Sequence, residues 1–217
     1  NQNKLNLFGI EPSKQASKMY KRIIPEAEIF LGSLEESEFR FQKFELISAN
    51  GVLEHVPNPI EFLNTISNML TEEGYCYIGV PNFKTNPADI FTYDHLSRFT
   101  PKTIKMLFSL TGFEVISELV SDVRVPMWYL IKKNKHVSKY SINITDQQDL
   151  FDKHSSDIKK TFQSIQNCYE NNIRDASKIA VYGTGSIFSL ATFYTDINFS
   201  DIYCYVDDND SIHGSKK

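Results

Sequence analysis

Polar and glycine residues stand where three predicted strands end, and their chemistry suits a small polar ligand. Glu11 follows the first strand, and its carboxylate can accept two charge-assisted hydrogen bonds from a ribose diol. Gly32-Ser33-Leu34 follows the second strand, where a flat ring can lie on backbone and a side chain. Asn50-Gly51 follows the third and lets backbone approach a ligand closely. In open α/β sheets, ligands bind outside these carboxyl ends of the strands.

Two of these features also have purely structural interpretations. Glu11 can simply cap the helix that follows it, because a carboxylate is stabilising near a helix N-terminus. The segment Glu54-His55-Val56-Pro57 leads from the third strand to a helix. We interpret His55 there as a side chain that only hydrogen-bonds the backbone.

A glycine pair near the C-terminus resembles part of a dinucleotide-binding pattern. Gly183 and Gly185 follow a strand, and Asp207 lies 24 residues after Gly183, near the spacing at which an acid meets a ribose. However, Phe188 stands where the pattern requires a third glycine, and it crowds the approach of helix and strand. We therefore predict a structural Rossmann-like unit that can help to hold a sugar nucleotide, in preference to a second cofactor site.

Alternating strands and helices position the first set of residues. Asn58, Pro59 and Glu61 signal the beginning of one helix, Gly74 signals its end, and Thr100-Pro101 and Gly112 bracket another. Such alternation predicts parallel strands with helical crossovers in an open α/β sheet. The expected strands are 5–10, 28–31, 44–49, 75–80 and 113–116, and the expected helices are 14–22, 59–70 and 100–111.

The remaining residues divide into a connecting part and a second α/β unit. Residues 121–143 give no clear pattern, and apolar residues then mark one long amphipathic helix from about 145 to 173. A strand at 178–182, a helix at 186–194 and a strand at 202–206 follow. We predict a first domain at 1–120, a linker with the long helix at 121–175, and a further domain beginning at 176–217.

Composition excludes several classes of protein. The 217 residues are 41% hydrophobic and carry a net charge of −4, which excludes a disordered or collagen-like chain. No basic stripe is present, so we expect no nucleic-acid partner. The three cysteines never form a Cys-x-x-Cys pair, so we expect a reducing cytosol and no cysteine-rich zinc site. No apolar run reaches about 18 residues and no signal peptide is recognisable, so we expect a cytoplasmic protein without a membrane span.

Several of these segments together resemble the class I S-adenosylmethionine-dependent methyltransferases. The resemblance implies that Glu11 holds the ribose hydroxyls, that Ser33 and Leu34 flank the adenine, and that Asn50 and Gly51 lie beside the methionine part. It also implies a Rossmann-like doubly wound sheet, here without the family's first strand and glycine-rich loop, followed by a truncated second Rossmann-like unit. The matching stretches are 9–13, 44–47, 52–56, 59–70, 78–82, 95–100 and 112–115.

The arrangement of segments is similar to that of sugar C-methyltransferases of deoxysugar pathways. In those enzymes a tyrosine and a histidine two residues later serve in proton transfer, and Tyr93 and His95 match them, with Asp94 where the family usually has Glu. The family's N-terminal zinc-binding region is absent here, and we expect no metal ligand. The resemblance implies methylation of a small-molecule acceptor such as a nucleotide-linked sugar, with His95 removing a proton and Tyr93 stabilising an oxyanion. Two alternatives stay open: an O-methyltransferase acting on a glycan, lipid or quinone precursor, and a non-catalytic module with a methyltransferase fold.

Overall fold

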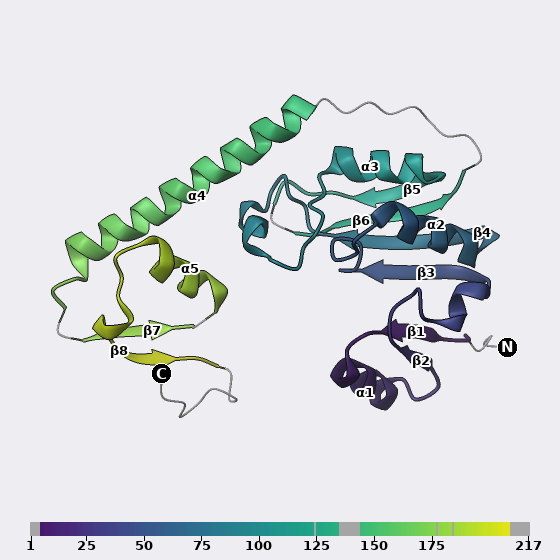
Figure 1. Ribbon diagram of the computed structural model, residues 1–217, viewed down its shortest axis with the longest axis horizontal. Helices are drawn as coiled ribbons and strands as arrows, with labels where there is room; N and C mark the ends of the chain where they lie inside the picture. Colours follow the sequence, from purple (N-terminus) through teal and green to yellow (C-terminus); the bar gives the residue numbers. More distant parts are fainter. Residues whose placement is uncertain (1–4, 124, 135–143, 177, 184, 209–217) are drawn as a thin grey trace. The chain divides into compact units, whose positions relative to one another are not determined.

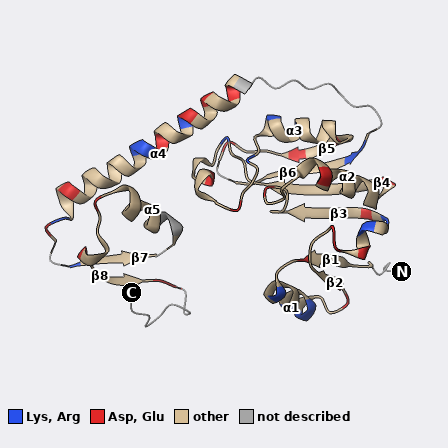
Figure 2. Cartoon of the chain, viewed as in Figure 1, with Lys and Arg blue, Asp and Glu red and all other residues tan. Residues whose placement is uncertain are grey.

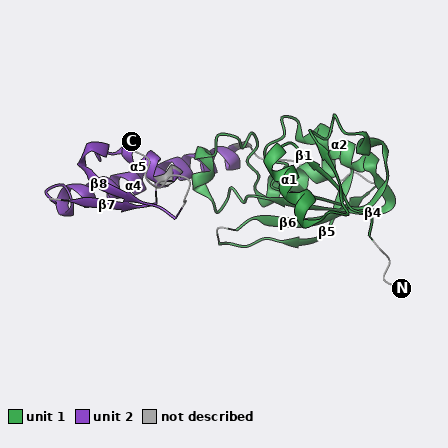
Figure 3. Cartoon of the chain, turned by 90° about the horizontal axis from the view of Figure 1, so that it is seen from below, with its two compact units in different colours: residues 1–142 green, residues 143–217 purple. Residues whose placement is uncertain are grey.

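The computed structural model describes residues 5–123, 125–134, 144–176, 178–183 and 185–208. It divides the chain into two compact units, residues 1–142 and 143–217, each of which is described by itself (Figure 3). Part of the stretch predicted as a linker, residues 135–143, lies outside the described residues, as does Thr184 of the Gly183-Thr184-Gly185 turn. Within the described residues, no helix combines the length and apolar character that crossing a bilayer requires.

A short parallel pair of strands begins the first unit. Strand β1 (Phe8–Glu11) pairs in parallel with β2 (Glu28–Leu31), and helix α1 (Lys14–Ile23) connects them as the sequence predicted (Figure 1). The Ser13 side chain caps α1 by accepting from the Ala16 N–H. The Phe8 and Phe44 rings pack edge to face with centroids 5.4 Å apart. The beginning of β1 therefore lies beside Phe44, the first residue of strand β3 (Phe44–Asn50).

A four-stranded sheet forms the centre of the first unit. Its order is β3 (Phe44–Asn50), β4 (Leu70–Val80), β6 (Met127–Lys133) and β5 (Phe113–Leu119). Strands β3 and β4 are parallel, whereas β6 is antiparallel to both of its neighbours. Among the described residues, no strand joins β1 to β3 by hydrogen bonds.

Strand β6 corrects the sequence prediction in two ways. The sequence pattern predicts neither a helix nor a strand for residues 127–133, and it predicts that all the strands are parallel. The described residues between β5 and β6 form no helix, so the chain turns back beside β5 and the pairing is antiparallel. Met127, Tyr129 and Ile131 alternate as fully buried side chains, which identifies a strand with one face on the core.

Two capped helices cover one face of this sheet. Helix α2 (Pro59–Met69) begins where predicted, because Asn58 accepts from the Glu61 N–H, and α3 (Pro101–Leu110) begins at a Thr100–Thr103 capping box. Single turns of 3-10 helix lie at η1 (Glu38–Phe41) and η2 (Pro87–Phe91). The predicted end of α2 at Gly74 is wrong. The helix ends at Met69, and Gly74 lies within β4, where a Cβ would come within 2.9 Å of the Phe44 carbonyl oxygen.

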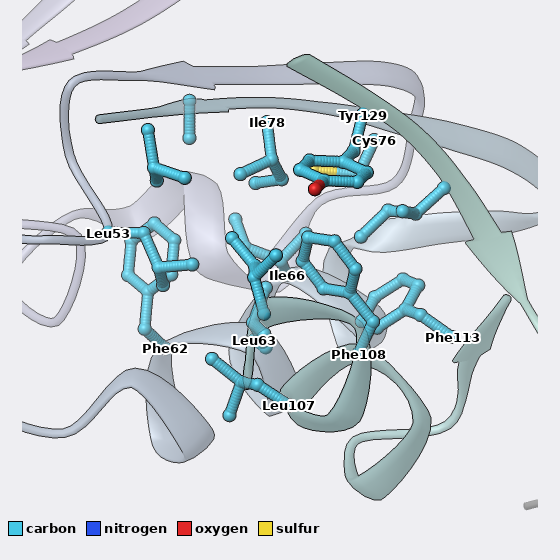
Figure 4. Packing of buried hydrophobic residues seen from close by; sticks show 14 of the residues in the cluster. Leu53, Phe62, Leu63, Ile66, Cys76, Ile78, Leu107, Phe108, Phe113 and Tyr129 are labelled. Atoms are coloured by element: carbon cyan, nitrogen blue, oxygen red, sulfur yellow. The ribbon is translucent and has the colours of Figure 1, made fainter. Parts of the chain in front are cut away.

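The core lies between the sheet and these helices. Figure 4 shows side chains of the strands, including Ile78 and Tyr129, pointing toward Leu63 and Phe108 on the helices. Ile78, Tyr129, Leu63 and Phe108 are all 0% exposed. This packing of helices on the sheet explains why apolar residues recur at helical spacing in α2 and α3. It also explains why buried and more exposed residues alternate with period two along β4 and β6.

The second unit contains the long helix and a second parallel pair. Helix α4 (Ile144–Asn172) carries interspersed acidic and basic residues, as Figure 2 shows. Strands β7 (Ile179–Tyr182) and β8 (Ile202–Val206) are parallel, with α5 (Ser186–Tyr194) and the short η3 (Phe199–Asp201) between them, which confirms the predicted α/β unit. The Tyr169 hydroxyl donates to Asp201 Oδ2 at 2.8 Å and fastens α4 to η3.

Candidate active site

Glu11 lies at the carboxyl end of β1, directly opposite the end of β2. It pairs in register with Leu31, and its carbonyl accepts from the Gly32 N–H at 3.2 Å. The half-buried carboxylate accepts from the Ser13 N–H at 2.7 Å through Oε1, at the beginning of α1. Among the described residues, no lysine or arginine forms an ion pair with Glu11, and Oε2 has no hydrogen-bond partner. One oxygen therefore serves the helix terminus, and the other can meet a ligand.

Ser33 and Leu34 follow β2 beside Glu11. The Ser33 N–H donates to Glu36 Oε2 at 2.8 Å, which closes a tight turn immediately after the strand. Leu34 is only 9% exposed and belongs to the hydrophobic core, while Ser33 is half-buried. The parallel pairing of β1 and β2 thus brings Ser33 next to the strand end that carries Glu11. The predicted contact of Leu34 with adenine stays a prediction.

Asn50 and Gly51 mark the end of β3. Asn50 is in register with Gly79, and the Gly51 N–H donates to the Gly79 carbonyl at 2.9 Å. A Cβ on Gly79 would lie 2.5 Å from both Asn50 Oδ1 and the Trp128 ring, so only glycine leaves room for the Asn50 amide. Gly51 has φ +63°, a conformation that glycine adopts without steric cost. A Cβ on Gly51 would lie 3.8 Å from Glu54 Oε1, so the end of β3 adjoins the next group of side chains.

That group centres on His95, which a buried aspartate holds. His95 Nδ1 lies 2.7 Å from Oδ1 of Asp89, whose side chain is 3% exposed. Arg98 organises the loop around them, because its Nε donates to the Asp89 carbonyl at 3.1 Å. Its terminal nitrogens donate to the carbonyls of His95, Ile90 and Thr92 at 3.1–3.2 Å. These bonds fix the position and orientation of the imidazole.

The second histidine of the group, His55, packs against the first. The two rings meet edge to face with centroids 4.8 Å apart. His55 Nδ1 lies 2.9 Å from the Asp94 carbonyl oxygen, which can only accept, so Nδ1 donates. His55 therefore forms a hydrogen bond to the backbone, in agreement with the interpretation from the sequence. The carbonyl that accepts this bond belongs to the loop after β4. In the uncharged form of either ring, a proton on Nδ1 leaves an unshared electron pair on Nε2.

Glu54 is the buried third member of the group that contains the two histidines. The residue is 3% exposed, its carbonyl accepts from the Ser97 N–H at 3.0 Å, and its Oε2 atom is buried without a hydrogen-bond partner. Burial raises the pKa of Glu54, because desolvation disfavours the charged form. A hydrogen bond to its own backbone and the charges of His55 and His95 partly oppose that shift.

The structure does not bring Tyr93 into this group. Its side chain is 94% exposed and makes no described hydrogen bond to His95. Its predicted role in proton transfer stays a prediction. Conversely, sequence reasoning missed Glu54 and Asp89 as members of the site. The adjacent pair Glu54-His55 was the only signal, and nothing in the sequence placed it against residues of the 82–99 loop.

The glycine pair of the second unit lies where β7 and β8 end together. The Gly183 N–H donates to the Val206 carbonyl at 2.8 Å, so Asp207, the next residue, follows the neighbouring strand at the same edge. Phe188 packs edge to face against Phe199 and Tyr205, with centroids 5.8 Å apart in both pairs. This packing supports the structural interpretation of Phe188, which stands at the sequence position of the third glycine in a dinucleotide-binding pattern.

Comparison with known proteins identifies one family and a set of similar folds. Residues 1–118 match a family described as a methyltransferase domain, and no curated protein matches the sequence. The TehB-like SAM-dependent methyltransferase from Corynebacterium glutamicum is 16% identical, with a TM-score of 0.46 over 59% of this chain and 68% of that one. Plantazolicin methyltransferase BpumL, solved with SAH, is 16% identical with a TM-score of 0.49 over 60% of this chain and 67% of that chain. Mitomycin 7-O-methyltransferase MmcR is 12% identical with a TM-score of 0.50 over 59% and 42% of the two chains, a likeness of fold.

Proposed function

The chain belongs to the methyltransferase-domain family, and from this premise we propose that it transfers a methyl group from S-adenosylmethionine to a small molecule. Its α/β sheet is of the Rossmann-like methyltransferase type, as predicted. One observation carries the proposal. The ends of parallel strands hold Glu11, Ser33 and Gly51. Gly51 adjoins Glu54, and Glu54 lies in one group with His95, which a buried aspartate orients.

The strand ends offer groups that fit the parts of this cofactor. Glu11 keeps Oε2 for the ribose diol while Oε1 holds the Ser13 N–H. Ser33 and Leu34 stand next to it for the adenine, and Asn50 with Gly51 permits a close approach of the methionine part to backbone. When bound, the cofactor supplies a methyl group that its sulfonium already activates. The protein's tasks are then to orient the acceptor for in-line attack and to remove a proton.

His95 is suited to remove that proton. Its Nδ1 donates to Asp89, so Nε2 is the atom that accepts. Asp89 holds the tautomer and stabilises the imidazolium that forms, and Arg98 holds the Asp89 backbone in place. Glu54 Oε1 would lie 3.8 Å from a Cβ on Gly51, and one carboxylate oxygen of Glu54 lies within 4.8 Å of a ring nitrogen of each histidine. We therefore expect the proton acceptor to lie near the methionine end of the bound cofactor.

For the acceptor we favour a carbon beside the ketone of a nucleotide-linked sugar. The Tyr93-Asp94-His95 sequence supports this choice, and the exposed Tyr93 hydroxyl is available to a developing enolate oxygen. The same His95–Asp89 pair would equally deprotonate a hydroxyl, so O-methylation of a glycan, lipid or quinone precursor is the second candidate. The second unit, with Gly183 and Asp207 at one sheet edge, is suited to help hold a sugar nucleotide.

Calorimetric titration with S-adenosylhomocysteine tests the cofactor site. Glu11→Gln is expected to bind about 2- to 30-fold more weakly than the parent, because a charge-assisted hydrogen bond is worth about 1.5–3 kcal/mol against about 1 kcal/mol for a neutral one. Gln still has an oxygen for the Ser13 N–H, so the beginning of α1 is preserved.

Glu28→Gln is the matched control, because Glu28 is an exposed glutamate at the opposite end of the same strand pair. It should bind like the parent. Equal affinity of Glu11→Gln and the parent would remove Glu11 from the ribose site. Failure of the full-length parent to bind the nucleoside at all would refute the proposed function.

A further inference from the structure

We propose that Glu54, His55 and His95 bind a divalent transition-metal cation, which competes with the methyl acceptor for His95. The three side chains come from two separate loops, one after β3 and one after β4. One ligand atom from each lies within 4.8 Å of the others. The binding site stands on its geometry alone, and its regulatory effect rests on the proposed function.

The spacing of the three ligand atoms is close to what one ion requires. Bonds from zinc to nitrogen or carboxylate oxygen are about 2.0–2.2 Å, so two ligands of one ion lie at most about 4 Å apart. The described spacing exceeds that limit by less than about 1 Å. Side-chain rotation can supply such a contraction, and the 38% exposed His55 side chain has room to turn.

Both histidines are already held as metal-binding histidines typically are. Such residues usually donate Nδ1–H to a carboxylate or a carbonyl, which fixes the ring and directs Nε2 to the metal. His95 meets the Asp89 carboxylate at 2.7 Å, and His55 meets the Asp94 carbonyl at 2.9 Å. Both imidazoles therefore already have the outer hydrogen-bond partner that a metal-binding histidine usually has. No motif in the sequence predicted a metal site at these residues.

Glu54 supplies an independent observation. Its side chain lies almost wholly out of water, and Oε2 has no hydrogen-bond partner. A buried polar atom without a partner is costly and calls for an explanation such as an ion. A cation bound by Glu54 and the two imidazoles would satisfy this oxygen. Within the part of the chain that the structure describes, Glu54, His55 and His95 are the only group of three histidine, cysteine or acidic residues close enough to share an ion.

The donor set selects the class of cation. Two imidazoles and one carboxylate suit Zn²⁺ and Co²⁺ better than Mg²⁺ or Ca²⁺, which prefer oxygen ligands. Three protein ligands leave a fourth position open to solvent or acceptor. Coordination uses the same Nε2 electron pair with which His95 would accept a proton. Bound metal should therefore inhibit methyl transfer, and a chelator should restore it.

The direct test is titration of the chelator-treated full-length protein with Co²⁺, followed by its visible absorption spectrum and then by displacement with Zn²⁺. The parent is expected to bind one Co²⁺ with the bands of a low-coordinate nitrogen and oxygen site. Glu54→Gln and His55→Gln should each weaken binding by about 10- to 100-fold or more, at least the loss seen when an outer partner is removed. Glu45→Gln, an exposed glutamate on β3, should bind like the parent.

His55→Gln keeps the inference testable if Glu54→Gln does not fold, which circular dichroism would show. The inference is overturned if the parent shows no Co²⁺ spectrum, or if a folded Glu54→Gln or His55→Gln variant binds the ion like the parent. Binding of Co²⁺ by a protein that binds no S-adenosylhomocysteine would leave the metal site standing and refute the methyltransferase proposal alone.

Discussion

Replacing His95 with alanine is expected to lower turnover by about 10²- to 10⁴-fold, the range that general acid–base groups contribute. The imidazole is the one group of the site that is oriented by a buried carboxylate and keeps an unshared electron pair on Nε2. Affinity for S-adenosylhomocysteine should stay within about twofold, because the predicted cofactor contacts lie on Glu11, Ser33 and Gly51. Steady-state turnover together with calorimetric titration measures both quantities.

Asp89→Asn separates positioning from chemistry in the same site. The amide cannot stabilise an imidazolium and can impose the other tautomer on His95, so turnover should fall while cofactor affinity is retained. Asp122→Asn, which changes an exposed aspartate outside the site, should leave turnover unchanged. Parent-like turnover in His95→Ala would exclude His95 as the base. A parallel loss of turnover and cofactor affinity would indicate general disruption of the loop.

Replacing Phe108 with alanine is expected to lower the free energy of unfolding by about 3–5 kcal/mol. The ring is 0% exposed and packs edge to face against Tyr129 with centroids 5.4 Å apart, at the junction of α3 and the central sheet. Its loss removes apolar area from the core and leaves a cavity between the helix and β6. Urea denaturation followed by circular dichroism measures the change in stability.

Phe41→Ala is the matched control within the same unit, since Phe41 is 76% exposed. Its effect should stay within about 0.5 kcal/mol, as for other surface substitutions. If Phe108→Ala and Phe41→Ala lower the free energy of unfolding by the same amount, the described packing of α3 on the sheet is incorrect. A cost below about 1 kcal/mol for Phe108→Ala would lead to the same conclusion.

Local signals in the sequence predicted most helix beginnings and the parallel strand pairs. Asn58 and Thr100 cap their helices through bonds to residues three positions on, so the short segment contains the whole signal. Gly112 ends α3 with φ +75°, again a local requirement. Gly74 was wrongly predicted to end a helix because the requirement for glycine there is long-range. A Cβ at this position would meet the carbonyl oxygen of Phe44 on a neighbouring strand.

Strand β6 shows why the sheet could not be fully predicted. Its alternation is visible only once Tyr129 and Ile131 are known to face the core, since Trp128 and Leu130 between them are also apolar. Its antiparallel pairing depends on contacts with β4, about 50 residues earlier in the chain. Periodicity alone does not distinguish such a segment from a buried helix or an irregular connection.

The candidate site was predicted in part for a similar reason. Glu11 and Ser33 follow the strands of one parallel pair, and Asn50 and Gly51 follow a strand of another, so their places at strand ends follow from the α/β pattern. The surroundings of His95 do not follow from it. Asp89 meets His95 within a loop whose carbonyls accept hydrogen bonds from Arg98. The Glu54 carbonyl accepts from the Ser97 N–H of the same loop. These contacts depend on a tertiary arrangement that has no spacing rule.

A crystal structure of the full-length protein with S-adenosylhomocysteine tests the central claim most directly. We predict ribose hydroxyls within hydrogen-bond distance of Glu11, adenine beside Ser33 and Leu34, and the sulfur atom directed from Gly51 toward His95 Nε2. A nucleoside bound elsewhere, or a Glu11 carboxylate that makes only its bond to Ser13, would contradict the account.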